Sequence, residues 1–165
     1  MNDKSSDNSV QEIKKFFNKF PENTASIVNM SCYQGIELSM NAGVDAAIGD
    51  FVYEFDNIYI DYDLDIIIKI YKEALKEYDI VSAISDSKSK LSSRIFYKVF
   101  NNNSNNMYQI HTETFRILSR RAINRIRSIN KTIPYRKVAY ANCGLKITSV
   151  NYKSIKKIKK QNISK

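Results

Sequence analysis

Residues 51–84 read FVYEFDNIYIDYDLDIIIKIYKEALKEYDIVSAI. The segments Phe51 to Phe55 and Ile80 to Ile84 are rich in β-branched and aromatic residues, which favours strands. Between them, apolar residues recur at the helical period from Ile66 to Leu75, which indicates an amphipathic helix. A strand, a helix and a strand in succession predict an α/β fold, with a mostly parallel sheet covered by helices on both faces.

The same patterns extend to both sides of this unit. Upstream they predict a helix from Val10 to Phe20, a strand from Ala25 to Met30 and a small-residue helix between Gly35 and Ala47. Downstream they predict a helix from Leu91 to Phe100, a helix from Arg120 to Ile129 capped by Ser119, and a last strand from Lys146 to Tyr152. We expect the strands near residues 25–30, 51–55 and 80–84 to share one sheet, with the helices of residues 10–20 and 66–75 packed on it.

The length and composition predict one domain. A chain of 165 residues that is 43% hydrophobic can bury one core. We assign the domain to residues 1–152 and expect residues 153–165, which are rich in lysine, to form a mobile basic tail. The sequence contains no run of about 20 apolar residues and no basic-then-apolar start typical of a secretory signal, so we expect a cytoplasmic protein.

The charge is divided unevenly along the chain. The formal net charge is +9, yet every Asp and Glu lies before Phe115, while the segment from Phe115 to Lys165 contains only basic charges. A basic region attracts phosphates, which can belong to nucleic acid, to an anionic membrane surface or to a phosphorylated substrate. Charge leaves these alternatives open. The sequence has no helix-turn-helix, zinc or aromatic RNA-binding signature, so a nucleic-acid-binding module is the least favoured of them.

Three stretches carry a more specific pattern. Residues 2–9 read NDKSSDNS, residues 35–52 read GIELSMNAGVDAAIGDFV, and residues 114–121 read TFRILSRR. In this order they resemble the D-D-G-S-x-D-x-T, G-x-x-x-A-x-N-x-G-x-x-x-A-x-G-D-Y-V and D-F-R-L-x-S-R-R segments of the inverting family 2 glycosyltransferases, whose fold is called GT-A. The resemblance is to bacterial enzymes that build cell-envelope polysaccharides or load sugars onto polyprenyl phosphate. It implies a transferase that uses a nucleotide-sugar donor and a glycan or lipid-phosphate acceptor.

The resemblance also implies a donor site. Asp3, Asp7, Asn41 and Asp56 correspond to positions that bind the nucleotide sugar in the family. The family places a D-x-D motif where this chain has Asp56-Asn57-Ile58, and that motif binds a divalent cation, Mg²⁺ or Mn²⁺. Strand alternation puts Glu54 on the same face as Asp56, so Glu54 can supply the second carboxylate. Asp56 can also be a polar strand end, and Asp7 a helix cap.

An acceptor site follows from the third stretch. Glu113 is the carboxylate nearest to it and is our candidate for the base that a sugar hydroxyl acceptor needs. A phosphate acceptor needs cations instead, and Arg116, Arg120 and Arg121 are clustered in sequence. The alternatives are a surface role for Glu113 and a solvated helix face for Arg120 and Arg121.

The chain departs from the family pattern in two ways. The family begins with a strand, a helix and a second strand before the aspartate turn, and Met1 leaves no room for them, so the resemblance implies an N-terminally truncated domain. Isoleucine replaces the second aspartate of D-x-D at Ile58. Enzymatic activity is therefore open, and the alternative is an inactive remnant or a partner subunit. The lysines of residues 153–165 predict peripheral contact with the anionic inner face of the cell membrane.

Overall fold

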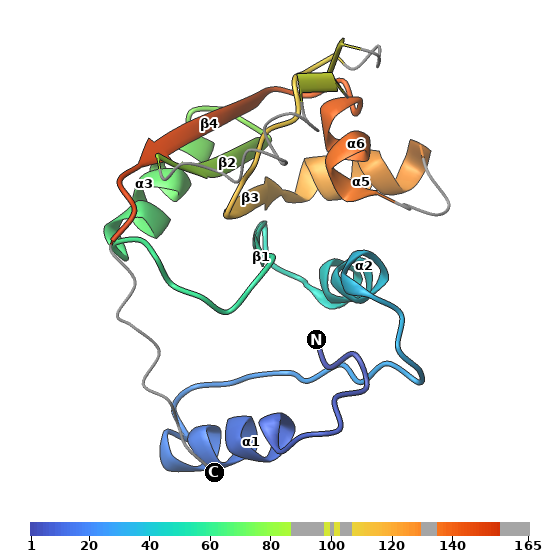
Figure 1. Cartoon of the computed structure of the whole chain (residues 1–165), viewed down its shortest axis with the longest axis vertical. Helices are drawn as coiled ribbons and strands as arrows, with labels where there is room; N and C mark the ends of the chain where they lie inside the picture. Colours follow the sequence, from blue (N-terminus) through green and yellow to red (C-terminus); the bar gives the residue numbers. More distant parts are fainter. Residues whose placement is uncertain (87–97, 100, 103–106, 130–134, 156–165) are drawn as a thin grey trace.

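The computed structural model describes residues 1–86, 98–99, 101–102, 107–129 and 135–155. The helices and strands in these residues follow in the order α1 (Ser9–Lys19), α2 (Ile36–Ala46), β1 (Phe51–Phe55), α3 (Asp65–Ala74), β2 (Ile80–Ser85), β3 (Phe115–Ser119), α5 (Arg120–Ile129), α6 (Arg136–Ala141) and β4 (Ile147–Tyr152). The fold is α/β, as the sequence predicts (Figure 1).

The sheet has four strands in the order β1-β3-β2-β4. β3 is antiparallel to both β1 and β2, whereas β2 and β4 are parallel. β1, β2 and β4 thus run in one direction, and β3 lies reversed between β1 and β2. The expectation of a mostly parallel sheet is not confirmed, because two of the three neighbouring pairs are antiparallel. The reversed strand was missed because FRILS is too short to show a clear alternation.

One face of the sheet packs against α3. The buried side chains on this face come from α3, from alternate positions of β2 and β3, and from the two tyrosines nearby: Tyr62, Ile66, Ile70, Ala74, Val81, Ala83, Phe115, Ile117 and Tyr152. Ile70 and Phe115 are fully buried, and each contributes about 1.5–3 kcal/mol by leaving water. The helix of residues 66–75 therefore packs on the sheet as predicted.

The opposite face packs against α5 and α6. Its buried side chains are Ile80, Leu118, Ala122, Ile123, Ile126, Tyr140 and Cys143. The hydroxyl oxygen of Ser119 accepts the backbone N–H of Ala122 at 3.1 Å and so caps α5 as expected. Helices on both faces of the sheet are confirmed. Because strand side chains alternate between faces, Glu54, Ser82 and Arg116 also point to the α5 and α6 side.

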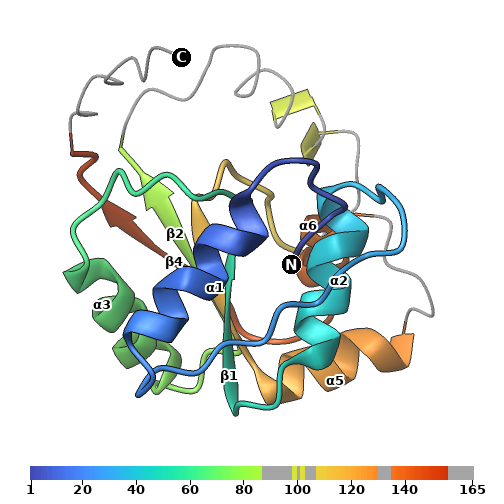
Figure 2. The same ribbon diagram turned by 90° about the horizontal axis from the view of Figure 1, so that it is seen from below.

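The N-terminal region differs most from the prediction. Residues 25–30 form no strand of the sheet; they make one parallel bridge, between Asn29 and Asn2. The reason is that only Asn2 runs beside them before the chain turns at Lys4, whose φ is 58°. α1 matches the predicted helix closely, but none of its residues is buried, so its predicted packing on the sheet is wrong. α1 lies beneath β1 instead (Figures 1 and 2).

Of the remaining predicted segments, two are confirmed and two lie largely outside the described residues. α2 and β4 match the helix of residues 35–47 and the strand of residues 146–152. The helix expected from Leu91 to Phe100 and the basic tail lie largely outside the described residues. Within the described part of the chain, no helix has the length and apolar character needed to cross a membrane.

Candidate functional site

Three carboxylates converge on one buried arginine where β1 ends and β3 begins. Arg116 is fully buried, and its Nη1 donates to Glu54 Oε2 at 2.7 Å. Its Nη2 donates to Asp56 Oδ2 at 3.1 Å, and its Nε to Glu113 Oε2 at 2.8 Å. The antiparallel register places Glu54 opposite Arg116, which explains how residues 62 positions apart meet.

A second arginine completes this cluster from α6. Arg136 Nη2 donates to Asp56 Oδ1 at 3.0 Å, and Nη1 lies 3.1 Å from Glu54 Oε1. Both its backbone N–H and its Nε donate to Glu37 Oε2, which belongs to α2. Tyr140 donates its hydroxyl to Glu54 Oε1 at 2.7 Å. We call these seven residues the carboxylate–arginine cluster: Glu37, Glu54, Asp56, Glu113, Arg116, Arg136 and Tyr140.

The cluster has more negative than positive charge. It holds four carboxylates and two guanidinium groups. Burial opposes the charge on Arg116, but Glu113, Glu54 and Asp56 outweigh it and raise the pKa of the guanidinium. Burial, followed by the charge of Glu54, raises the pKa of Tyr140, which stays a neutral donor. Asp56 and Glu113 keep about a fifth and a sixth of their side chains exposed, so these two meet solvent while Glu54 does not.

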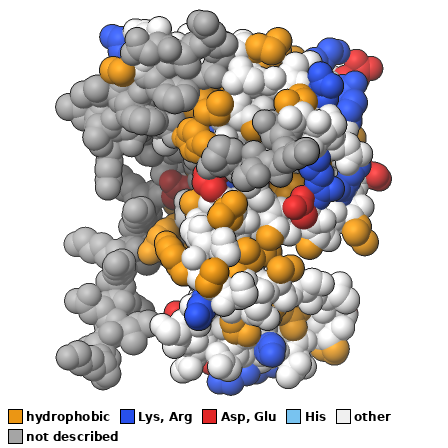
Figure 3. All heavy atoms as spheres, turned by 90° about the vertical axis from the view of Figure 1, so that its right-hand side faces the viewer, with side chains coloured by type: hydrophobic (Ala, Val, Ile, Leu, Met, Phe, Trp, Pro, Cys, Tyr) orange, Lys and Arg blue, Asp and Glu red, His pale blue; other side chains and the backbone are white. Residues whose placement is uncertain are grey.

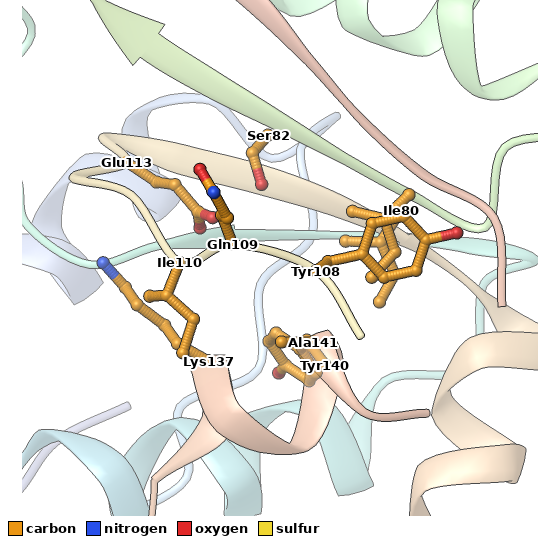
Figure 4. Close-up of a pocket in the computed structure, with 10 residues that line it drawn as sticks. Ile80, Ser82, Tyr108, Gln109, Ile110, Glu113, Lys137, Tyr140 and Ala141 are labelled. Atoms are coloured by element: carbon orange, nitrogen blue, oxygen red, sulfur yellow. The ribbon is translucent and has the colours of Figure 1, made fainter. Parts of the chain in front are cut away.

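A small pocket adjoins the cluster on the α6 side of the sheet. Its cavity volume is only about 30 Å³, and it is partly open to solvent. In Figure 4, Ser82, Gln109 and Glu113 point toward the same part of this pocket, while Ile80 and Tyr108 lie at its other end. Because Glu113 lines the pocket and also binds Arg116, a group held in the pocket would lie beside a carboxylate that an arginine orients.

The predicted nucleotide-binding aspartates near the N-terminus serve as acceptors for backbone groups. Asp3 accepts the N–H groups of Gln34 and Gly35, both at 2.8 Å, at the start of α2. Partial burial opposes its ionisation, but these bonds outweigh it and lower the pKa of Asp3. Asp7 accepts the backbone N–H of Ser9, the first residue of α1, at 3.0 Å, but the N-cap position of that helix is occupied by Asn8. Asn41 lies partly buried on α2.

The three acceptor-side arginines do not come together. Arg116 lies in the cluster, whereas Arg120 and Arg121 lie at the opposite end of β3. Arg120 donates to the carbonyl oxygens of Ala47 and Gly49. Arg121 forms a bidentate pair with Asp79, at 2.8 and 2.7 Å. Any site built at the end of β1 therefore contains Arg116 without the other two.

Three members of the cluster are absent from the predicted site. Glu37, Arg136 and Tyr140 lie 17 or more positions from Glu54 in sequence, and no local pattern connects them to it. The excess of Arg and Lys after Phe115, together with the carboxylates of residues 54 and 56, could have indicated arginine partners, but we interpreted it only as a phosphate-attracting region. A charged side chain that is buried on a strand must pair with an opposite charge, because an unpaired buried charge is strongly destabilising.

Comparison with known proteins gives a similarity to a glycosyltransferase. No protein-family model matches the chain. The chain is 29% identical over 134 residues to an uncharacterized glycosyltransferase of Synechocystis sp.. The aligned region covers 75% of this chain but only 41% of that relative, so the chain spans less than half of the relative's length.

Proposed function

We propose that this protein is a glycosyltransferase domain of the inverting family 2, GT-A class, and that the carboxylate–arginine cluster is its nucleotide-sugar site. The similarity to a glycosyltransferase supports the general class. The observation that carries the site is the meeting of Asp56 and Glu113 on one guanidinium, since these are the donor-side and acceptor-side candidates. The cluster also lies at the carboxyl end of β1, where ligands bind in open α/β sheets.

Four members of the cluster have roles in this proposal. An inverting transfer is one in-line displacement, in which the acceptor oxygen attacks the anomeric carbon as the nucleoside diphosphate leaves. Glu113 accepts the proton of an acceptor hydroxyl. Arg116 orients the Glu113 carboxylate by binding its Oε2, and Asp56 faces the donor. Arg136 lies beside Asp56 and can add positive charge near the departing diphosphate.

A divalent cation fits Asp56 better than Glu54. Mg²⁺ binds through one or two carboxylates together with substrate phosphates, and Asp56 reaches solvent. Glu54 is enclosed and already paired with two guanidinium groups and a phenol. Within the described residues, no group of three or more His, Cys, Asp or Glu is placed to hold an ion. A cation here would neutralise diphosphate charge, with Asp56 as its protein ligand.

A second candidate is a remnant or partner subunit without activity of its own. Both oxygens of Asp56 accept hydrogen bonds from guanidinium groups, and this pairing stabilises the cluster without any ligand. Under this alternative the cluster is structural. The acceptor and a role in envelope glycan synthesis belong to the transferase proposal alone.

Calorimetry with UDP-sugars and GDP-sugars, in the presence of Mg²⁺ or Mn²⁺ and then of a chelator, separates the two candidates. The transferase proposal predicts metal-dependent binding that Asp56→Asn abolishes. Asp63→Asn is the matched control, since Asp63 lies exposed in the loop after β1, and it should bind normally. Tight binding that survives Asp56→Asn would exclude Asp56 from the site, and no binding of any donor would favour the remnant.

A further inference from the structure

We propose that Tyr152 is a positioning residue, whose hydroxyl group connects the donor-side loop of residues 56–61 to the acceptor-side segment of residues 113–116. Tyr152 is the last residue of β4, and its side chain is buried. It is not a member of the carboxylate–arginine cluster. The consequence for the reaction rests on the proposed function, but the connection between the two segments can be measured without it.

The Tyr152 hydroxyl group bonds to Asp61 and Thr114 in a defined direction. Its oxygen lies 3.1 Å from Asp61 Oδ1 and 2.5 Å from Thr114 Oγ1. An ionised carboxylate can only accept, so the Tyr152 proton is donated to Asp61 and the Thr114 hydroxyl donates to the Tyr152 oxygen. Burial raises the pKa of Tyr152, so the phenol keeps the proton that this arrangement needs.

On the acceptor side, this hydrogen bond reaches the residue next to the candidate base. Thr114 follows Glu113 directly, and its backbone N–H donates to the carbonyl oxygen of Ala83 in β2 at 2.9 Å. Neighbouring Cα atoms are about 3.8 Å apart, so a fixed Thr114 restricts where the backbone of Glu113 can lie. The Glu113 carboxylate in turn accepts Arg116 Nε–H at 2.8 Å. Tyr152 therefore acts on the base through Thr114.

On the donor side, the bond holds the far end of the loop that starts at Asp56. Asp61 also accepts the hydroxyl of Ser154 at 3.3 Å, and its carbonyl oxygen accepts the backbone N–H of Ile155 at 2.8 Å. Figure 1 shows this loop, between β1 and α3, reaching the end of β4. Ile58, between the two aspartates, is 92% exposed, so packing does not hold the loop there. The position of Asp56 therefore depends on its arginine partners and on the anchor at Asp61.

The proposed transfer requires a fixed separation between these two segments. Displacing reacting groups by about 1 Å can lower the rate of a reaction about 100-fold. Because both bonds end on one oxygen atom, loss of that atom releases the loop and the acceptor-side segment together. A purely structural role of Tyr152 would instead predict a lower stability of the fold without a selective loss of turnover.

Amide hydrogen exchange, measured by NMR in the chain without ligand, tests the connection. Tyr152→Phe removes the oxygen and keeps the ring, which packs against Tyr62 with centroids 5.7 Å apart. We expect exchange to quicken about tenfold at Thr114 and at Ile155 together, because the backbone at both amides loses an anchor. Tyr62→Phe changes the neighbouring ring in the same way. It is the matched control and should leave both amides unchanged.

A second control lies on the other side of the molecule, where α2, α5 and α6 form a face with acidic side chains beside basic ones (Figure 3). Asp45→Asn breaks the exposed pair that Asp45 in α2 forms with Arg127 in α5, and it should leave Thr114 and Ile155 unchanged. Thr114→Val removes the acceptor-side bond alone, so it should quicken exchange at Thr114 and not at Ile155. This variant keeps the proposal testable if Tyr152→Phe does not fold.

The consequence for the reaction is measured as release of the nucleoside diphosphate from a UDP-sugar or GDP-sugar with Mg²⁺, with water as the acceptor. We expect Tyr152→Phe to lower kcat about tenfold or more while KM stays within about twofold, because the donor still binds but the two segments lose their fixed separation. With Tyr152→Phe, faster exchange at one amide only or at neither, or a change in KM with kcat unchanged, overturns the proposal. A wild-type chain that releases no nucleotide would count against the proposed function instead, and the exchange results would still decide whether Tyr152 connects the two segments.

Discussion

Replacing Arg116 by glutamine should destabilise the fold severely. The change removes three ion pairs, with N–O distances of 2.7, 3.1 and 2.8 Å. Asp56 and Glu113 are partly exposed and can turn to water, but the Glu54 side chain is 1% exposed and cannot. Removing one partner of a buried pair costs about 3–5 kcal/mol. Arg136 and Tyr140 still bind Glu54, so we expect about 3 kcal/mol.

Urea unfolding followed by circular dichroism measures this loss, because the midpoint shifts while the slope stays constant. The matched control is Glu73→Gln, which breaks the exposed pair with Lys76 and should cost less than about 1 kcal/mol. The double variant Arg116→Gln, Glu54→Gln should recover part of the loss, since it no longer buries an unpaired charge. Equal losses for Arg116→Gln and Glu73→Gln would refute the reasoning.

Three further predictions concern other parts of the chain. Lys4 has a positive φ, which costs a non-glycine residue about 1 kcal/mol, so Lys4→Gly should stabilise the protein. Lys14→Gly, inside α1, should destabilise it by a similar amount. Thermal unfolding measures both changes, and destabilisation by both substitutions would contradict this prediction. Hydrogen bonds from the side chain and backbone N–H of Ser9 lower the pKa of Asp7 in the folded state. The contribution of the Asp7 carboxylate to the stability of the fold is therefore present above about pH 4 and disappears as the pH falls through the folded pKa. The stability difference between wild type and Asp7→Asn should therefore be present at neutral pH and vanish in acid, and a difference independent of pH would disprove it. Residues 153–165 should make the protein sediment with anionic but not with neutral vesicles, because each lysine near an anionic surface contributes about 1 kcal/mol of binding free energy. High salt should abolish this binding. Equal sedimentation after deletion of residues 153–165 would exclude a membrane role.

Most of the helices and strands that were predicted correctly have a clear signal in their own residues. α1, α3 and α5 have strong apolar periodicity, and β1 and β2 have strand composition, so each could be recognised from its own residues. Residues 25–30 share that composition, but among the described residues their β-bridge is to Asn2 alone. Strand formation depends on a partner that local sequence does not specify. The reversal of β3 likewise depends on tertiary pairing.

The candidate site was predictable in part. Strand alternation placed Glu54 and Asp56 on one face, and both bind Arg116 and Arg136 from that face. The sequence grouped Arg116 with Arg120 and Arg121, but β3 separates them because they lie at opposite ends of that strand. α6 brings Arg136 to the cluster although Arg136 follows Asp56 by 80 positions. No local sequence pattern predicts a contact between residues so far apart.

The claim that the carboxylate–arginine cluster binds a nucleotide-sugar donor is tested most directly by NMR of the arginine side chains. The Nε–H signals of Arg116 and Arg136 are followed while a UDP-sugar or GDP-sugar is added with Mg²⁺. We predict that both signals shift saturably, with the dissociation constant found by calorimetry, while the signal of Arg121, which pairs with Asp79 at the other end of β3, stays in place. Saturable donor binding that leaves the Arg116 and Arg136 signals unmoved would contradict the account.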